Sequence, residues 1–144
     1  MLFHSTRGGD KDKDFASILM QGLADDGGLF MPDHWPQVDL EKIKGLQSFV
    51  EVAKEIVPLF TASSFTQAET IKIVENTWHD FEHQDLVGIQ TIENISVLEL
   101  FHGPTAAFKD FGLQLAAAFF NEVLEKEDKT ALVLGATSGD TGSA

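Results

Sequence analysis

The sequence predicts an α/β protein, with a helical section over residues 1–90 and the beginning of a parallel βαβ sheet over residues 91–144. Three observations predict this class. Apolar residues recur at helical spacing through the first section. After Asp85, a strand pattern, a long amphipathic helix and a short apolar strand pattern follow one another, which is typical of a βαβ unit. The chain is also 43% hydrophobic, with 12 Phe and 2 Trp, so it can bury a core.

The helical section is organised by turns and capping residues. Residues 14–23 predict a helix that ends in a glycine-rich turn. Residues 29–36 predict a connection along the surface, and a short helix is expected after Asp39. Ser48 and Thr66 each stand three residues before a glutamate, the capping-box pattern that begins a helix. The apolar face of the last of these helices is expected to contain Ile71, Val74, Trp78 and Phe81.

The second section predicts a strand over residues 95–101, a helix over 106–126 and a fully apolar strand over 131–135. The helix is apolar over so wide an arc that burial on more than one side is expected. A right-handed parallel connection would join the two strands. Because two strands do not make a stable, doubly covered parallel sheet, we expect the 144 residues to be part of a longer protein.

Composition restricts the classes of function. The formal net charge of −13 disfavours binding to a phosphate backbone, so nucleic acid is not an expected partner. The chain has no Cys, which excludes disulfides and thiolate metal sites. No apolar run approaches the roughly 20 residues that span a bilayer, and the N-terminus lacks the pattern of a secretory signal. We therefore expect a cytoplasmic protein without a membrane partner.

The first chemical motif places Lys109 in the first turn of the long helix, directly after a strand and a Gly-Pro loop. The positive end of a helix disfavours the charged ammonium form and so favours the neutral amine. A neutral lysine amine is a nucleophile suited to forming a Schiff base with an aldehyde. The alternative is a surface lysine paired with Asp110. Sequence physics leaves these two interpretations equally open.

The second motif follows the 131–135 strand and consists of the loop Thr137, Ser138, Gly139, Asp140 and Thr141. Backbone N–H groups of such a loop favour an anion such as a carboxylate or phosphate. The loop lacks the Gly-Lys-Ser/Thr ending of a P-loop and the spacing of a dinucleotide fingerprint. An ordinary strand-to-helix turn is the alternative.

Residues 102–110 (His-Gly-Pro-Thr-Ala-Ala-Phe-Lys-Asp) followed by residues 136–142 (Ala-Thr-Ser-Gly-Asp-Thr-Gly) closely resemble threonine synthases. This family uses pyridoxal 5'-phosphate (PLP) and has the tryptophan-synthase-β architecture, fold type II. Residues 5–8 (Ser-Thr-Arg-Gly) and 22–29 (Gly-Leu-Ala-Asp-Asp-Gly-Gly-Leu) resemble the family's N-terminal signatures. The lysine motif in looser form marks the whole fold type, and its combination with the N-terminal signatures narrows the resemblance to threonine synthase.

The resemblance implies that Lys109 carries PLP, that Phe108 and Asp140 contact the cofactor, and that loop 137–141 receives the substrate's α-carboxylate. It also implies the reaction of the family. O-phospho-L-homoserine and water give L-threonine and phosphate by β,γ-elimination and replacement. The family's glycine-rich loop for the PLP phosphate is not found in the 144 residues, and neither is the hydroxyl residue that faces the pyridine nitrogen. We therefore expect this piece alone to be inactive.

Several other polar residues have two interpretations. Arg7, the single Arg, could bind the substrate's phosphate or form an ion pair with Asp25 or Asp26. His102 is interpreted as a loop-shaping residue rather than an acid–base group. A further pair, His79 and His83, has the i, i+4 spacing of a helical metal site, but no third ligand is evident and surface histidines are favoured. No metal is expected.

Two other functions remain possible from the sequence. One is a different PLP lyase of the same fold type, such as a threonine or serine dehydratase, against which the signature at residues 5–8 argues. The other is a non-catalytic threonine-synthase-like protein that binds PLP or phospho-ligands. Retention of Lys109 argues against that function. The oligomeric state does not follow from the sequence.

Overall fold

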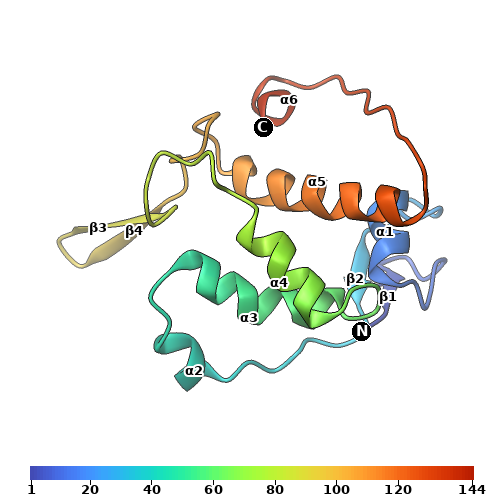
Figure 1. Ribbon diagram of the computed structural model, residues 1–144, viewed down its shortest axis with the longest axis horizontal. Coiled ribbons are helices and arrows are strands. Elements are labelled where there is room, and N and C mark those ends of the chain that lie inside the picture. The colour runs from blue at the N-terminus through green and yellow to red at the C-terminus, as the bar shows by residue number, and fades with distance from the viewer. The chain divides into compact units, whose positions relative to one another are not determined.

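The computed structural model describes residues 1–144 and confirms a mixed α/β class (Figure 1). The chain divides into two units, Met1–Glu75 and Asn76–Ala144. The division expected at residue 90 concerns the domains of the whole protein and stays a prediction. None of the helices is long and apolar enough to cross a membrane.

The first unit begins with a short antiparallel strand pair. β1 (Phe3–Ser5) pairs with β2 (Phe30–Pro32), so that Phe3 lies opposite Pro32 and Ser5 opposite Phe30. The surface connection expected over residues 29–36 therefore contains a short strand at residues 30–32, which was not predicted. This aromatic and Pro-rich segment can form a strand because Pro32 is the last residue of β2. At that position the absence of a proline N–H removes no hydrogen bond from the middle of the strand pair.

Four helices complete the first unit: α1 (Phe15–Gln21), α2 (Leu40–Lys44), α3 (Phe49–Thr61) and α4 (Gln67–Glu75) (Figure 1). The expected caps are confirmed. The Ser48 side chain accepts a hydrogen bond from Glu51 N, and Thr66 and Glu69 bond each other reciprocally. These contacts satisfy N–H groups that the first helical turn leaves without partners.

Rings and hydroxyls connect these helices in the core. The Phe15 ring lies 6.4 Å from that of Phe3 and 6.1 Å from that of Phe65. The hydroxyls of Thr61 and Thr70 are both buried and lie 2.8 Å apart, joining α3 to α4. Each hydroxyl thus has the partner that a buried polar group requires.

The last helix of this unit is shorter than expected. α4 ends at Glu75, and Trp78 has a φ of 64°, a left-handed conformation that cannot continue a helix. Trp78 and Phe81 therefore do not share the α4 face, contrary to expectation. Instead, the Trp78 indole N–H donates to Phe111 O at 2.9 Å, and the Phe81 and Phe111 rings are 4.8 Å apart.

The second unit contains an antiparallel hairpin of β3 (Gly88–Ile92) and β4 (Ile95–Glu99). The strand expected at 95–101 is confirmed, but its neighbour is β3. No parallel pair forms among these residues. A two-residue turn closes β3 on β4 at small entropic cost. The prediction of a strand at 131–135 is wrong for these residues, which form no strand and pair with none. Among them, Leu132, Val133 and Leu134 are 82–85% exposed.

The long helix α5 (Lys109–Lys126) follows, and the short helix α6 (Asp140–Ser143) comes near the end of the chain (Figure 1). α5 begins three residues later than expected because Ala106 has a φ of 54° and the backbone before it forms a turn. The apolar residues of α5 are buried unevenly: Phe119 and Val123 are buried, whereas Leu113 is exposed.

Candidate active site at the start of α5

Lys109 is the first residue of α5, as the sequence predicts. The preceding residue, Phe108, occupies the N-cap position and makes no side-chain capping bond. The Lys109 side chain is 29% exposed, and its Nζ lies 5.7 Å from the centre of the Phe108 ring. The amine is therefore partly shielded, at the positive end of an 18-residue helix.

Lys109 joins the two chemical motifs. Its Nζ donates to Asp140 Oδ2 at 2.6 Å, which connects the start of α5 to the start of α6. This hydrogen bond and the positive charge of Lys109 lower the pKa of the Asp140 carboxyl, with partial burial acting in the opposite direction. The structure thus does not pair Lys109 with Asp110, the alternative that the sequence left open.

Asp110 instead points into the loop that precedes α5. The residue is fully buried, and its carboxylate accepts hydrogen bonds from Thr105 N at 3.0 Å and Thr105 Oγ1 at 2.7 Å. Successive helical side chains diverge by about 100°, since a turn takes 3.6 residues. Lys109 and Asp110 can therefore point in different directions from the same helical turn. Sequence reasoning assigned Asp110 only a possible surface ion pair.

The 137–141 loop is organised by one hydroxyl. Thr137 Oγ1 accepts hydrogen bonds from Gly139 N at 3.2 Å and Gly142 N at 3.1 Å. Gly139 has a φ of 138°, a conformation that L side chains rarely adopt. Ser138 and Thr141 are exposed. Of the loop residues named from the sequence, Asp140 is the one brought against Lys109.

Arg7 belongs to the first unit, in the turn after β1. Its Nη1 donates to the main-chain oxygen of Asp26 at 3.0 Å, rather than to a carboxylate. The Asp26 carboxylate binds Ser5 Oγ at 2.6 Å, Gly9 N at 2.7 Å and Gly28 N at 2.8 Å. The Ser5 hydroxyl is the largest cause of a lowered pKa at Asp26, followed by Gly28 N–H; the Arg7 charge contributes least.

The histidines do not form the arrangement that their spacing suggested. His79 and His83 follow the end of α4 and are not helical, so they do not share a helix face. His102 Nε2 lies 3.0 Å from Glu99 Oε2, and its ring centre lies 4.6 Å from that of His83. These contacts place His102 between the end of β4 and the loop before α5. Nothing in the sequence pattern indicated the Glu99 partner.

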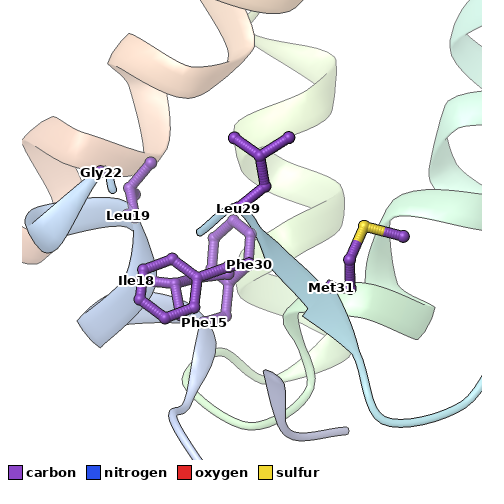
Figure 2. Close-up of a pocket in the computed structure, with 7 residues that line it drawn as sticks. All are labelled: Phe15, Ile18, Leu19, Gly22, Leu29, Phe30 and Met31. Atoms are coloured by element: carbon purple, nitrogen blue, oxygen red, sulfur yellow. The ribbon is translucent and has the colours of Figure 1, made fainter. Parts of the chain in front are cut away.

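An apolar pocket of about 430 Å³ lies in the first unit, between α1 and β2 (Figure 2). Figure 2 shows Phe15 and Ile18 of α1 close to Phe30, with Leu29 and Met31 on either side of Phe30 along the chain. None of the residues predicted to carry chemistry lines this pocket. The remaining lining residues are Leu19 and Gly22.

Comparison with known proteins gives a consistent result. The family model described as "Threonine synthase N terminus" matches residues 2–78. The chain is 43% identical over its whole length to threonine synthase of Pseudomonas aeruginosa and covers 31% of that protein. It is 36% identical over its whole length to "Threonine synthase-like 2" of Xenopus laevis, again covering 31%.

A solved structure agrees with the sequence relatives. The crystal structure of PLP-bound threonine synthase from Brucella melitensis is 42% identical and superposes with a TM-score of 0.89, covering 97% of this chain and 31% of that one. The chain therefore spans about a third of the length of the relatives it matches. On the family model and these relatives, the chain belongs to the threonine synthase family.

Proposed function

We propose that the whole protein containing these residues is a PLP-dependent threonine synthase, which converts O-phospho-L-homoserine and water to L-threonine and phosphate. The observation that carries the proposal is the hydrogen bond between Lys109 and Asp140. It joins the lysine motif at the start of α5 to the hydroxyl- and glycine-rich loop in one place. Membership of the family and the PLP-bound relative support the same activity.

The residues around Lys109 have the chemistry that PLP requires at its aldehyde end. Lys109 would hold the cofactor through Nζ, and Phe108 would offer an apolar ring surface beside it. Asp140 would orient the amine, since its carboxylate accepts the Nζ–H hydrogen bond. When bound, PLP supplies an electron sink that stabilises negative charge on the substrate's carbons.

The other steps are assigned to side chains of this chain. Lys109 Nζ would accept and return protons between substrate carbons. Residues 137–141 would receive the α-carboxylate, with the hydroxyls of Thr137, Ser138 and Thr141 as donors and Gly139 shaping the loop. The fixed turn supports this, because Thr137 Oγ1 accepts hydrogen bonds from Gly139 N and Gly142 N.

Arg7 is proposed to bind the phosphate of the substrate. Its hydrogen bond goes to a neutral main-chain oxygen, so the guanidinium keeps further N–H donors for an anion. Loss of this phosphate and addition of water at the β-carbon complete the family reaction. The substrate is a small molecule, and nucleic acid and membrane are not proposed partners.

A second candidate is a threonine-synthase-like protein that binds PLP or a phospho-ligand without producing threonine. The relatives named "Threonine synthase-like 2" support this second candidate, because they match the whole chain at 35–38% identity. A threonine or serine dehydratase of the same fold type is the remaining alternative, and substrate choice distinguishes it.

The deciding experiment uses the whole protein loaded with PLP. Phosphate release and threonine formation are measured with O-phospho-L-homoserine, and 2-oxo acid formation is measured with L-threonine and L-serine. We expect threonine and phosphate in equal amounts and no 2-oxo acid. Lys109→Ala should lose both turnover and the visible absorbance of lysine-bound PLP. Turnover by Lys109→Ala with its absorbance intact would contradict the assignment of Lys109.

A further inference from the structure

Asp110 is a buried acid, and the proposed reaction assigns no role to it. It is 0% exposed, in the first turn of α5, immediately after Lys109. Its side chain meets Thr105 and not a cation, because both hydrogen bonds to its carboxylate come from that residue. A buried carboxylate without a charged partner is costly unless its surroundings compensate for the lost water. Its burial beside Lys109 therefore calls for a role.

The loop that Asp110 binds is held in an unusual backbone conformation. Ala106 has a φ of 54°, which is uncommon for a residue with a side chain, and Ala106 N donates to Gly103 O at 3.0 Å. Such conformations persist where the surrounding contacts fix them. The two bonds from Thr105 to Asp110 lie next to this position and supply that constraint.

Gly103 contributes close packing to the same arrangement. A Cβ added at Gly103 would lie 2.4 Å from Asp110 Oδ2 and 2.7 Å from Asp110 Cβ, so the glycine backbone rests directly on the acid's side chain. Gly103 is itself buried. The loop is thus held at two points, by contact at Gly103 and by hydrogen bonds at Thr105.

We propose that Asp110 is a positioning residue for Lys109: by binding Thr105 twice and packing on Gly103, it fixes the loop against the first turn of α5 and so sets where the Lys109 amine lies. This inference rests on the proposed role of Lys109 as the PLP lysine. The position of Lys109 depends on the loop because Lys109 is the residue at which the loop becomes helix. The carboxylate also suits the first turn of a helix, where negative charge is favoured.

The test uses the whole protein and four variants. Asp110→Asn removes one acceptor, because its amide nitrogen cannot accept from Thr105. Thr105→Val removes the hydroxyl bond alone, and Thr105→Ser retains both bonds. The matched control is Val123→Ala in the same helix, which leaves a cavity at a buried position (Val123 is 3% exposed). Fourteen residues of helix, roughly 21 Å, separate that position from Lys109.

Four quantities are measured for each variant: Tm, the kcat and the KM for O-phospho-L-homoserine, and the rate at which borohydride fixes PLP onto Lys109. Misplacing a reacting group by about 1 Å costs on the order of 100-fold in rate. We expect Asp110→Asn to lower kcat and the borohydride rate by about that factor with little change in KM. Thr105→Val should show a smaller loss, and Thr105→Ser should behave as wild type. Val123→Ala should lower Tm and leave both rates near wild type.

The outcomes separate this inference from the proposed function. If Lys109→Ala keeps turnover and the absorbance of lysine-bound PLP, the proposed role of Lys109 fails first. If Lys109→Ala behaves as expected but Asp110→Asn changes only Tm, as Val123→Ala does, the positioning role is wrong and the function stands. Should Asp110→Asn not fold, the two Thr105 variants decide, and equal rates for Thr105→Val and Thr105→Ser would overturn the inference.

Discussion

The Lys109 amine and the Asp140 carboxylate, 31 residues apart in the chain, are joined by a 2.6 Å hydrogen bond. Both groups are partly exposed, with side-chain exposures of 29% and 47%. Solvent screening makes such a pair a modest contributor to stability. Its value is geometric, because it keeps the loop before α6 beside the first turn of α5.

The first prediction concerns the acid sensitivity of this pair. The pKa of Asp140 is lowered from its ordinary value of 3.8, first by the Lys109 hydrogen bond. A carboxyl with a lowered pKa stabilises the folded state above its unfolded value, and this stabilisation is lost as pH falls through the folded value. Asp140→Asn should therefore be less stable than wild type near neutral pH, and the difference should shrink below about pH 3.8. Denaturant unfolding at several pH values measures it. A difference that does not change with pH would contradict the prediction.

The second prediction concerns Arg7. If Arg7 binds the substrate's phosphate, Arg7→Ala should lower kcat/KM by about 10- to 150-fold, the range expected for one hydrogen bond to a charged group. Tm should change little, because the replaced contact is a single exposed bond to Asp26 O. Steady-state kinetics and a melting curve together measure the effect, with Arg7→Lys as the charge-retaining comparison. A lowered Tm with normal kinetics would assign Arg7 to structure alone.

The third prediction concerns the hydroxyl of Thr141. Thr141→Val should raise KM for O-phospho-L-homoserine by about tenfold or more, since a hydrogen bond to the substrate's carboxylate is lost. The absorbance of lysine-bound PLP should remain. Ser143→Ala is the control, because the Ser143 hydroxyl donates to Gly139 O, within its own helical turn. Equal KM values for the two variants would show that the loop is an ordinary strand-to-helix turn.

The fourth prediction concerns the buried hydroxyl pair of α3 and α4. Thr70→Val should destabilise the protein by about 0.5–1.5 kcal/mol, because it removes the 2.8 Å hydrogen bond to the buried Thr61 hydroxyl, which still donates to Val57 O at 3.3 Å. Adding Thr61→Val should cost less than a second such loss, since the hydrogen bond between the two hydroxyls is already gone. Denaturant unfolding of the two single variants and the double variant measures this coupling. Additive losses would show that the two hydroxyls do not depend on each other.

The sequence predicted the elements whose causes are local. Ser48 and Thr66 mark helix starts through side-chain capping, and α3 and α4 begin immediately after them. The end of α4 depends on the backbone near Trp78, which fits the apolar spacing of the helix but has a φ of 64°. Apolar spacing carries no information about backbone angles, so the sequence predicted a longer helix than the structure shows.

Strand pairing was less predictable because it depends on which neighbour is available. The pattern at residues 95–101 identified β4, but its partner β3 contains Gly88, Gln90 and Thr91 and lacks a strong strand pattern. The fully apolar segment at 131–135 has the stronger pattern and remains unpaired. A strand pattern in the sequence indicates residues that can be buried in a sheet, but it does not indicate which strand will pair with them.

The sequence indicated the main residues of the candidate site but not the residues that hold them in position. The position of Lys109 at the start of α5 followed from the strand, loop and helix pattern, whereas its role as the PLP lysine rests on the family resemblance and stays a proposal. Asp110 could not be recognised as a buried group, since an acid beside a lysine equally suggests a surface pair. Its direction follows from the turn at Thr105 and the packing of Gly103. Both contacts are local in the chain, but they depend on the positive φ of Ala106, which the residue pattern does not specify.

The two tryptophans give each unit its own optical reporter. Trp35 belongs to Met1–Glu75, is 67% exposed and has its ring edge-on to Phe60, whereas Trp78 belongs to Asn76–Ala144 and is 4% exposed with its indole N–H bonded. A water-soluble quencher should therefore extinguish the fluorescence of Trp35 and spare that of Trp78. Following the two emissions separately in Trp35→Phe and Trp78→Phe proteins would show which unit loses its structure first during unfolding.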